Sequence, residues 1–327
     1  MDIYNVNGIP EDLTIDEAAN KEGFFVFQNA IGNFIYLGGE KIYEIETLCF
    51  ELRNLLAVKM FGSISEYHRM IEHPIYPLVA QGGIDAEIRI SKEDFEKFVS
   101  DYEDKQTIYR MLYFFDIDSL IGTLQNCVVE TNYSVGEFYK QLNINNFLIN
   151  EEILSFKDGI QYAAGGIVTN ITSLVNRIFI CLYSILDFIT KIVHEVEQLQ
   201  LEFDSYPRLR SKDTLLGYAK KTTFNEMEST LFEKTDYRKM IEYLRNEIIH
   251  NASIDSIPKV YQKVVYNKIV EKFILLPDFT DGNIDTFRNR KRFFDNDTKL
   301  NEVLPDLIND YFRRLSFTLQ QVNKYCR

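Results

Sequence analysis

The stretch of sequence that decides the fold reads Leu182-Tyr183-Ser184-Ile185-Leu186-Asp187-Phe188-Ile189-Thr190-Lys191. It belongs to a longer helical pattern over residues 167–201, and apolar side chains occupy most of the helix circumference between residues 178 and 189. A helix that is apolar on nearly all sides lies at the centre of a bundle or is shared between a core and a partner subunit. The stretch therefore predicts a mainly α protein built around one long helix.

Other elements follow from periodicity and from the residues that begin or end helices. Helical spacing of apolar residues predicts helices over residues 44–61, 105–124, 134–142, 213–222, 236–250 and 302–325. Gly62 ends the first of these, and Ser91-Lys92-Glu93-Asp94 resembles a capping box that opens a helix through about Tyr102. Strands are predicted as a pair within residues 24–36, over residues 86–90, and as a hairpin within residues 258–277.

The length of 327 residues suits two domains, and the sequence changes character near Gly159. We predict an α-rich α+β domain of unknown role over residues 1–160. Residues 161–327 are predicted to form an up-and-down helical bundle with a small β-hairpin insertion. The glycine pairs of the chain match neither a P-loop nor a dinucleotide-binding fingerprint, so no cofactor is predicted.

The charge is unevenly distributed. The chain carries a net charge of −13, which argues against a protein that coats nucleic acid. Residues 1–150 carry 24 acidic and 11 basic side chains, whereas residues 151–327 carry 25 of each. The second half can therefore approach a polyanion through local basic clusters, while the first half is repelled by it.

Targeting signals are not evident in the sequence. The N-terminus lacks the basic and apolar regions of a signal peptide, and the most apolar run, residues 178–189, is short for a membrane span. The four cysteines are far apart and form no Cys-x-x-Cys pair, which fits reduced thiols (Cys49, Cys127, Cys181 and Cys326). We expect a cytoplasmic protein that does not bind a membrane.

The chemistry is expected at the end of the predicted 236–250 helix, which reads Tyr243-Leu244-Arg245-Asn246-Glu247-Ile248-Ile249-His250-Asn251. Residues four apart share a helix face, so Asn246 and His250 line up. Arg245 and His250 are five apart, and their side chains leave the axis about 140° apart. One helix therefore brings them together poorly, but two copies facing across a twofold axis would place both pairs in one cleft.

Such a cleft has the groups that RNA cleavage needs. An imidazole can act as general acid or base near neutral pH, and a guanidinium can hold a phosphate and stabilise its growing charge. RNA supplies its own nucleophile, the 2′-hydroxyl beside each phosphate. The motif predicts that His250 handles the proton, that Arg245 binds the scissile phosphate and that Asn246 orients them, with neither metal nor cofactor.

Arg245-Asn246-x-x-x-His250 resembles the signature of the HEPN superfamily, in which an Arg, a polar residue, three variable residues and a His end the third helix of a bundle. The stretch over residues 182–191 resembles that family's second helix, where one polar residue interrupts an apolar surface, and Asp187 matches this residue. The last helix resembles a closing bundle helix, so the resemblance covers about residues 165–327. The region 258–277 and the basic loop after it depart from a minimal four-helix version.

The resemblance implies a homodimeric, metal-independent endoribonuclease that leaves 2′,3′-cyclic phosphate and 5′-hydroxyl ends. It implies a role as a toxin or antiphage abortive-infection effector with an antitoxin or regulatory partner, and a role for Asp187 in orienting Arg245 or His250. The loop Arg288-Asn289-Arg290-Lys291-Arg292 is expected to bind RNA phosphates through Arg288, Arg290, Lys291 and Arg292, although a charge run is usually a solvated loop.

Plainer interpretations stay open. Arg245 can be a surface residue, and His250 can be a cation that suits the negative end of a helix dipole. The alternative function is a catalytically inactive HEPN-like module for dimerisation or for binding nucleic acid or a partner, and a third interpretation is an unrelated helical scaffold. No metal site is predicted: His68 and His73, near Glu66 and Glu72, are five apart, whereas zinc ligands on a helix prefer four. Asp116 and Asp118 are expected at a turn near a helix, and His194 is expected to be structural.

Overall fold

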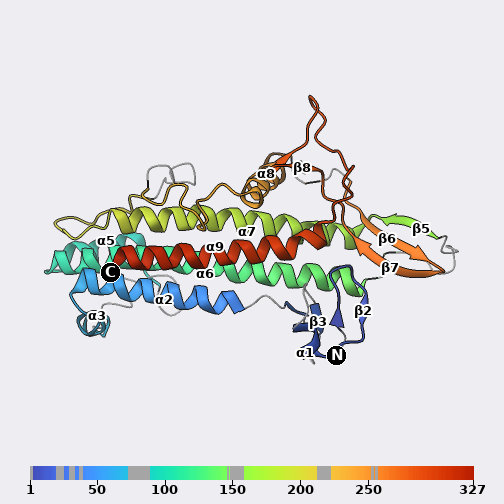
Figure 1. The fold of residues 1–327 in the computed structure, drawn as a ribbon. Coiled ribbons are helices and arrows are strands. Elements are labelled where there is room, and N and C mark those ends of the chain that lie inside the picture. Colours follow the sequence, from blue (N-terminus) through green and yellow to red (C-terminus); the bar gives the residue numbers. More distant parts are fainter. Residues whose placement is uncertain are drawn as a thin grey trace. The chain divides into compact units, whose positions relative to one another are not determined.

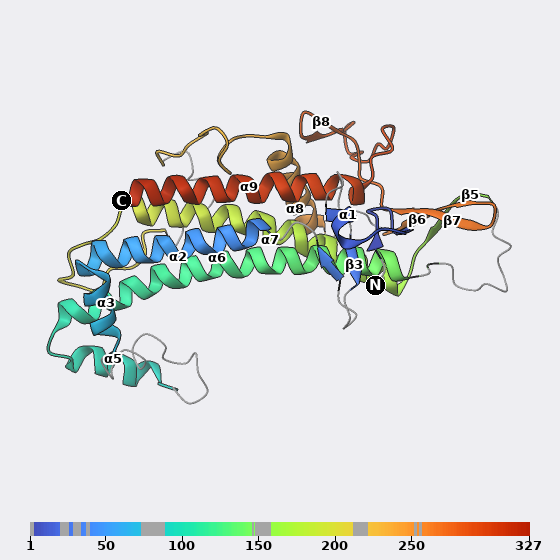
Figure 2. The same cartoon turned by 60° about the horizontal axis from the view of Figure 1, so that its bottom comes forward.

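The computed structural model describes residues 3–19, 26–28, 34–36, 40–72, 89–145, 147, 158–211, 222–251, 254 and 257–327. Long helices dominate this part of the chain (Figures 1 and 2), so the prediction of a mainly α protein with helical-bundle character is confirmed. The helices are α1 (Ile15–Ala19), α2 (Glu40–Phe61), α3 (Ile64–Ile71), α5 (Lys92–Asp101), α6 (Lys105–Ile144), α7 (Gly166–Glu197), α8 (Asp236–Asn251) and α9 (Leu300–Cys326).

The described strands form small antiparallel sheets. One sheet has the order β2-β1-β3-β4 and contains β1 (Ile3–Tyr4), β2 (Pro10–Glu11), β3 (Val26–Gln28) and β4 (Phe34–Tyr36). A second has the order β5-β6-β7, with β5 (Gly159–Ala163), β6 (Val260–Val265) and β7 (Lys268–Phe273). The third pairs β8 (Phe279–Thr280) with β9 (Asn283–Ile284). The β3–β4 pair and the β6–β7 hairpin confirm two predictions, whereas β5 was not predicted.

Two predicted helix ends are confirmed by their geometry. Helix α2 stops at Phe61, and Gly62 has a φ of 84°, a conformation that favours glycine. The Ser91 hydroxyl accepts a hydrogen bond from the backbone N–H of Asp94 at 3.0 Å, as expected for the N-cap of α5. Both ends depend on residues close together in sequence, which is why they were predictable.

The prediction of separate helices over residues 105–124 and 134–142 is wrong, because α6 continues through the intervening residues. Val128 and Thr131 are buried there. Their packing outweighs the weak helix propensity of β-branched residues, so the helix does not break. Residues 89–90 have no regular structure, whereas residues 86–88 of the same predicted strand and residues 213–221 lie outside the described residues.

The chain divides into two compact units, each assembled from separate segments. The first unit comprises Met1–Tyr43, Cys127–Ser184 and Lys234–Arg314, and the second comprises Glu44–Asn126, Ile185–Glu233 and Leu315–Arg327. Helices α2, α6, α7 and α9 contribute residues to both. These units do not follow the predicted boundary between residues 160 and 161. That boundary concerns domains that fold independently, and it stays a prediction.

In the first unit, a proline in α9 is compensated by a side chain from α6. Pro305 has no backbone N–H, so the carbonyl of Asn301, one turn earlier, lacks its usual helical donor. The hydroxyl of the fully buried Tyr139 donates to this carbonyl at 2.7 Å. The Asn301 side chain in turn donates to the carbonyl of Val6 at 2.9 Å and accepts from the backbone N–H of Ile274 at 3.1 Å. Asn301, near the start of α9, therefore links the N-terminal segment to the residue that follows β7.

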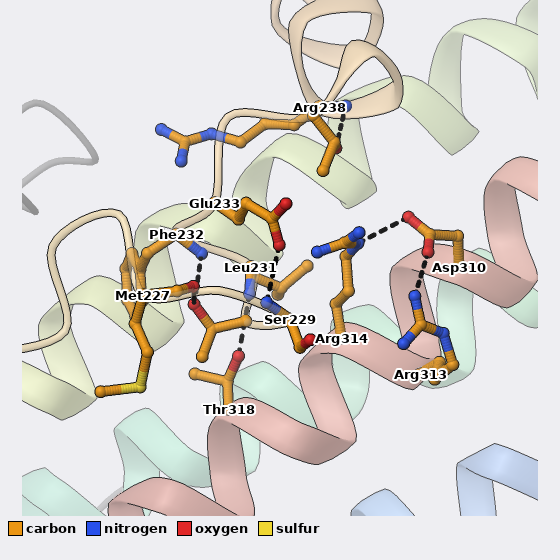
Figure 3. A network of polar contacts seen from close by, with 12 residues as sticks. Met227, Ser229, Leu231, Phe232, Glu233, Arg238, Asp310, Arg313, Arg314 and Thr318 are labelled. Atoms are coloured by element: carbon orange, nitrogen blue, oxygen red, sulfur yellow. Dashed lines mark hydrogen bonds and ion pairs between the residues drawn. The ribbon is translucent and has the colours of Figure 1, made fainter.

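In the second unit, polar contacts accompany an apolar helical core. The Ser316 hydroxyl in α9 donates to the Glu44 carboxylate in α2 at 2.6 Å, and the Tyr113 hydroxyl in α6 donates to the buried Glu195 carboxylate in α7 at 3.0 Å. The Thr318 hydroxyl accepts from the backbone N–H of Leu231 at 3.0 Å (Figure 3). These bonds satisfy polar groups that would be costly to bury alone.

Helix α7 has the apolar character that the sequence predicted. Its buried side chains recur along its whole length: Val168, Ile171, Val175, Ile178, Phe179, Leu182, Ile185, Leu186, Ile189, Ile192 and Val193. Of the helices in the described part of the chain, α7 alone is long and apolar enough to cross a membrane by length and composition. A buried core helix has the same properties, so the expected cytoplasmic location stays a prediction.

Candidate functional site

Helix α8, which carries the predicted motif, is positioned by an apolar stripe and by a close backbone contact. Met240, Ile241, Leu244 and Ile248 are buried, and they recur at helical spacing along one side of the helix. At its N-terminus, the β8–β9 turn approaches so closely that a Cβ on Gly282 would lie 2.7 Å from the Cα and carbonyl oxygen of Asp236. Gly282 also has a φ of 74°, so glycine is required there on both counts.

The Arg245 guanidinium is held between an aromatic ring and an amide. It lies over the ring of Tyr183 in α7, 4.5 Å from the ring centroid. Its Nη1 donates to the side-chain oxygen of Asn246 at 2.9 Å. A guanidinium stacked on a ring and hydrogen-bonded at one edge has a restricted orientation. Arg245 is half-buried, so the remaining donors are still partly open to solvent.

The opposite face of α8 is exposed. Asn246 and His250 are exposed, and the neighbouring Ile249 is 50% exposed. Arg245 and His250 are five residues apart on the helix, so their side chains leave its axis about 140° apart. The Arg245 guanidinium bends toward Asn246, which shares a face with His250. The exposed face combines an imidazole, an amide and an uncovered isoleucine. These are features of a surface that can meet another chain.

Glu247 connects α8 to the basic loop. Its carboxylate accepts hydrogen bonds from Lys291 at 2.7 Å, from Asn251 at 2.8 Å and from the Tyr243 hydroxyl at 3.1 Å. Burial raises the pKa of Glu247, but these three hydrogen bonds outweigh burial and lower its pKa. For Tyr243, burial and the neighbouring Glu247 carboxylate raise the pKa to about 12. Glu247 is therefore a carboxylate that anchors a cation.

The basic loop has its own scaffold. Phe287 and Arg290 exchange two backbone hydrogen bonds of 2.9 Å across a tight turn, in which Arg288 has a φ of 54°. The buried Asp278 carboxylate accepts from the backbone N–H groups of Asp295 at 2.7 Å and Asn296 at 3.1 Å. The first pair of bonds closes the turn around Arg288, and the second pair holds the segment that follows Arg292.

An open groove of about 640 Å³ lies between the loop and the C-terminal end of α8. It is lined by Glu247, Asn251, Asn289, Arg290, Lys291 and Arg292. The structure thus brings three of the four predicted RNA-binding residues to the helix that carries the motif. Arg288 is not part of the lining, and its guanidinium lies 5.6 Å from the centroid of the Phe287 ring.

The other predicted residues lie elsewhere. Asp187 is half-buried on α7 in the second unit, and its role toward Arg245 or His250 stays a prediction. Asp116 and Asp118 lie inside α6 and not at a turn; the hydroxyl of Tyr206 donates to Asp116, and Arg53 forms an ion pair with Asp118. Burial raises the pKa of both carboxyl groups.

The remaining histidines do not gather with other ligands in the described residues. His68 is exposed on α3, whereas His73 lies outside the described residues. His194 is half-buried near the end of α7. Among the residues that the structure describes, no three His, Cys, Asp or Glu side chains come together as a metal site.

Comparisons of the chain with models of protein families, with curated proteins and with solved structures found no match. The class of protein is therefore defined by the fold and site alone. It is a mainly helical protein in which an Arg-Asn-x3-His helix end adjoins a cation-lined groove.

Two residues of this site were missed by sequence reasoning. Glu247 lies four residues after Tyr243 and four before Asn251, so their shared helix face was a usable signal. Tyr183 had no such signal, because its contact with Arg245 joins two helices far apart in sequence.

Proposed function

We propose that this chain is a HEPN-type, metal-independent endoribonuclease that acts as a homodimer. The observation that carries the proposal is the combination on α8 of an oriented Arg245, an exposed His250 and an adjoining cationic groove. The exposed face around Asn246 and Ile249 supports a second copy as the partner, because the side chains of Arg245 and His250 leave the axis of one helix about 140° apart.

The proposed reaction transfers two protons, one from the attacking 2′-hydroxyl and one to the leaving 5′-oxygen. An imidazole removes the proton from the ribose 2′-hydroxyl, and the 2′-oxygen attacks the adjacent phosphorus. The bond from phosphorus to the 5′-oxygen breaks, and a second, protonated imidazole gives its proton to that oxygen. The products are a 2′,3′-cyclic phosphate and a 5′-hydroxyl. Two copies of His250 supply the base and the acid, and Arg245 stabilises the charge on the phosphate oxygens.

The groove extends this site along the substrate. Arg290, Lys291 and Arg292 offer cations for phosphates next to the scissile linkage. Lys291 is only partly available, because it is paired with Glu247. An RNA phosphate near Lys291 therefore competes with Glu247 for this cation, which leaves Arg290 and Arg292 as the main phosphate contacts of the groove.

The second candidate function is a binding module without catalysis. It is favoured by the structural contacts of the motif itself, since Arg245 is already engaged by Tyr183 and Asn246. This alternative predicts that a nucleic acid or protein partner binds the groove but that RNA is never cut.

The deciding experiment incubates the purified full chain with end-labelled single-stranded RNA in the presence of EDTA. We expect cleavage, cyclic phosphate ends, and loss of activity in His250→Ala with unchanged thermal stability. His68→Ala is the matched control, because His68 is also exposed on a helix, and it should cleave like the wild type. Cleavage that requires Mg²⁺, or that persists in His250→Ala, contradicts the proposal.

The role as a toxin or antiphage effector has its own test in cells. Expression of the wild-type chain should arrest bacterial growth and degrade RNA, and His250→Ala should relieve both effects. Arrest by His250→Ala at the same expression level argues against a role that depends on RNA cleavage.

A further inference from the structure

The β5–β6–β7 sheet has one packed face and one open face. Cross-strand pairing places Tyr162, Tyr261 and Phe273 opposite one another, so their side chains share a face. The same register puts Ile160 opposite Lys263 on that face. Side chains on the other face are buried, including Val260, Gln262, Val264 and Lys272. The alternation is what an antiparallel sheet with one solvated face requires, but the solvated face here is aromatic.

The three rings form a row across the strands. The ring centroids of Tyr162 and Tyr261 are 6.3 Å apart, and those of Tyr261 and Phe273 are 5.4 Å apart with nearly parallel planes. Exposure increases along the row: Phe273 is buried, Tyr261 is half-buried, and Tyr162 has 63% of its surface exposed. Ile160 on the same face is 61% exposed. The Phe273 ring thus stacks beside the Tyr261 ring, and Tyr162 is open to a ligand.

Lysines are interleaved with these rings. The Nζ of Lys259 lies 5.7 Å from the centroid of the Tyr162 ring, and Lys263 is exposed beside Ile160. Glu271, which pairs with Lys263 across the strands, is already engaged by Lys299 in an ion pair. The open part of the face therefore offers flat rings and positive charge together, and the Glu271 carboxylate beside them is neutralised.

We propose that this face, formed by Ile160, Tyr162, Lys259, Tyr261 and Lys263, binds single-stranded RNA. Bases stack on Tyr162 and Tyr261, and phosphates pair with Lys259 and Lys263. Base–aromatic stacking is independent of sequence because every base has a flat face, and cations beside the rings follow the backbone. Lys259 is half-buried, and its contact with the Tyr162 ring holds its cation beside that ring.

The choice of RNA as the ligand rests on the proposed endoribonuclease function, but the binding face is separate from α8. It provides an attachment point that does not take part in the chemistry. Loss of the site should therefore raise KM for long RNA and leave kcat unchanged, which a catalytic residue would not do.

The test measures binding of a fluorescein-labelled single-stranded RNA to the full-length His250→Ala chain by fluorescence anisotropy. Replacing Tyr162 by Leu should weaken binding about tenfold, whereas Tyr162→Phe, which keeps the ring, should bind within about twofold of its parent. Tyr133→Leu is the matched control, because Tyr133 is 61% exposed on α6 and lies outside the ring row. Lys263→Gln should reduce the slope of log Kd against log salt by about one.

Two results overturn the proposal. One is an unchanged Kd in Tyr162→Leu, and the other is equal weakening in Tyr162→Leu and Tyr133→Leu. A change of oligomeric state in Tyr162→Leu with unchanged RNA binding assigns the face to a protein interface instead. The assay measures binding and does not require cleavage. A failure of the RNA-binding face can therefore be distinguished from a failure of the endoribonuclease proposal.

Discussion

At the scale of single residues, the contact between Arg245 and Tyr183 decides where the guanidinium points. Replacing Tyr183 by Leu removes the ring and should lower kcat/KM for RNA cleavage by about tenfold, whereas Tyr183→Phe keeps the cation–π contact and should stay within about twofold. The measurement is the rate of cleavage of labelled RNA in EDTA. Equal losses in both variants would show that the hydroxyl, and not the ring, matters.

Lys272 gives the second prediction at this scale. Its Nζ is buried and donates to the carbonyls of Asn143 at 2.7 Å and Asn145 at 3.2 Å, and burial lowers its pKa from 10.5 to about 8. Between these values the unfolded chain binds more protons, so the free energy of unfolding should rise with pH by up to about 3 kcal/mol. Below pH 8 the cost of burying the charge is fully present.

Urea unfolding on both sides of this interval checks the effect. Lys272→Met should abolish the rise in stability with pH, whereas Lys268→Met, at an exposed position of the same strand, should keep it. A rise that persists in Lys272→Met would have to come from another group.

At the scale of elements, α9 depends on the hydroxyl of Tyr139. Tyr139→Phe leaves the buried carbonyl of Asn301 without a donor and should lower the free energy of unfolding by about 1–3 kcal/mol. In a Pro305→Ala background the restored backbone N–H can serve that carbonyl, so the same substitution should cost less. Thermal or urea unfolding of the wild type, the two single variants and the double variant gives the coupling free energy between the two substitutions. An equal cost in both backgrounds contradicts this account.

The second prediction for elements concerns the turn that positions α8. Gly282→Ala should lower the free energy of unfolding by more than about 1 kcal/mol, because its Cβ meets the backbone of Asp236 and its φ is positive. Gly62→Ala separates the two causes, since Gly62 has a φ of 84° and open space around its Cβ. The cost in thermal unfolding should be larger at Gly282. Equal costs would mean that only backbone strain matters.

At the scale of the whole molecule, the proposed site needs two chains. Cleavage per chain should therefore fall when the protein is diluted below its dimer dissociation constant, and sedimentation velocity over the same concentrations should report monomers. Ile249→Glu places a charge on the exposed face of α8. It should shift the midpoint of the fall in cleavage rate and the midpoint of dimer dissociation to higher protein concentration. A cleavage rate per chain that does not change while the dimer dissociates contradicts a shared site.

The sequence by itself determined the local structure of this protein. The helical period fixed most helices, Ser91 and Gly62 fixed helix ends, and the β6–β7 hairpin and the Arg-Asn-x3-His segment were readable because they depend on residues a few positions apart. Only the tertiary structure decided that α6 is continuous, that β5 completes a sheet, that Tyr183 meets Arg245 and that Lys291 reaches Glu247. The physical reason is that these contacts join residues distant in sequence. Their partners are selected by packing and burial, which no local pattern records.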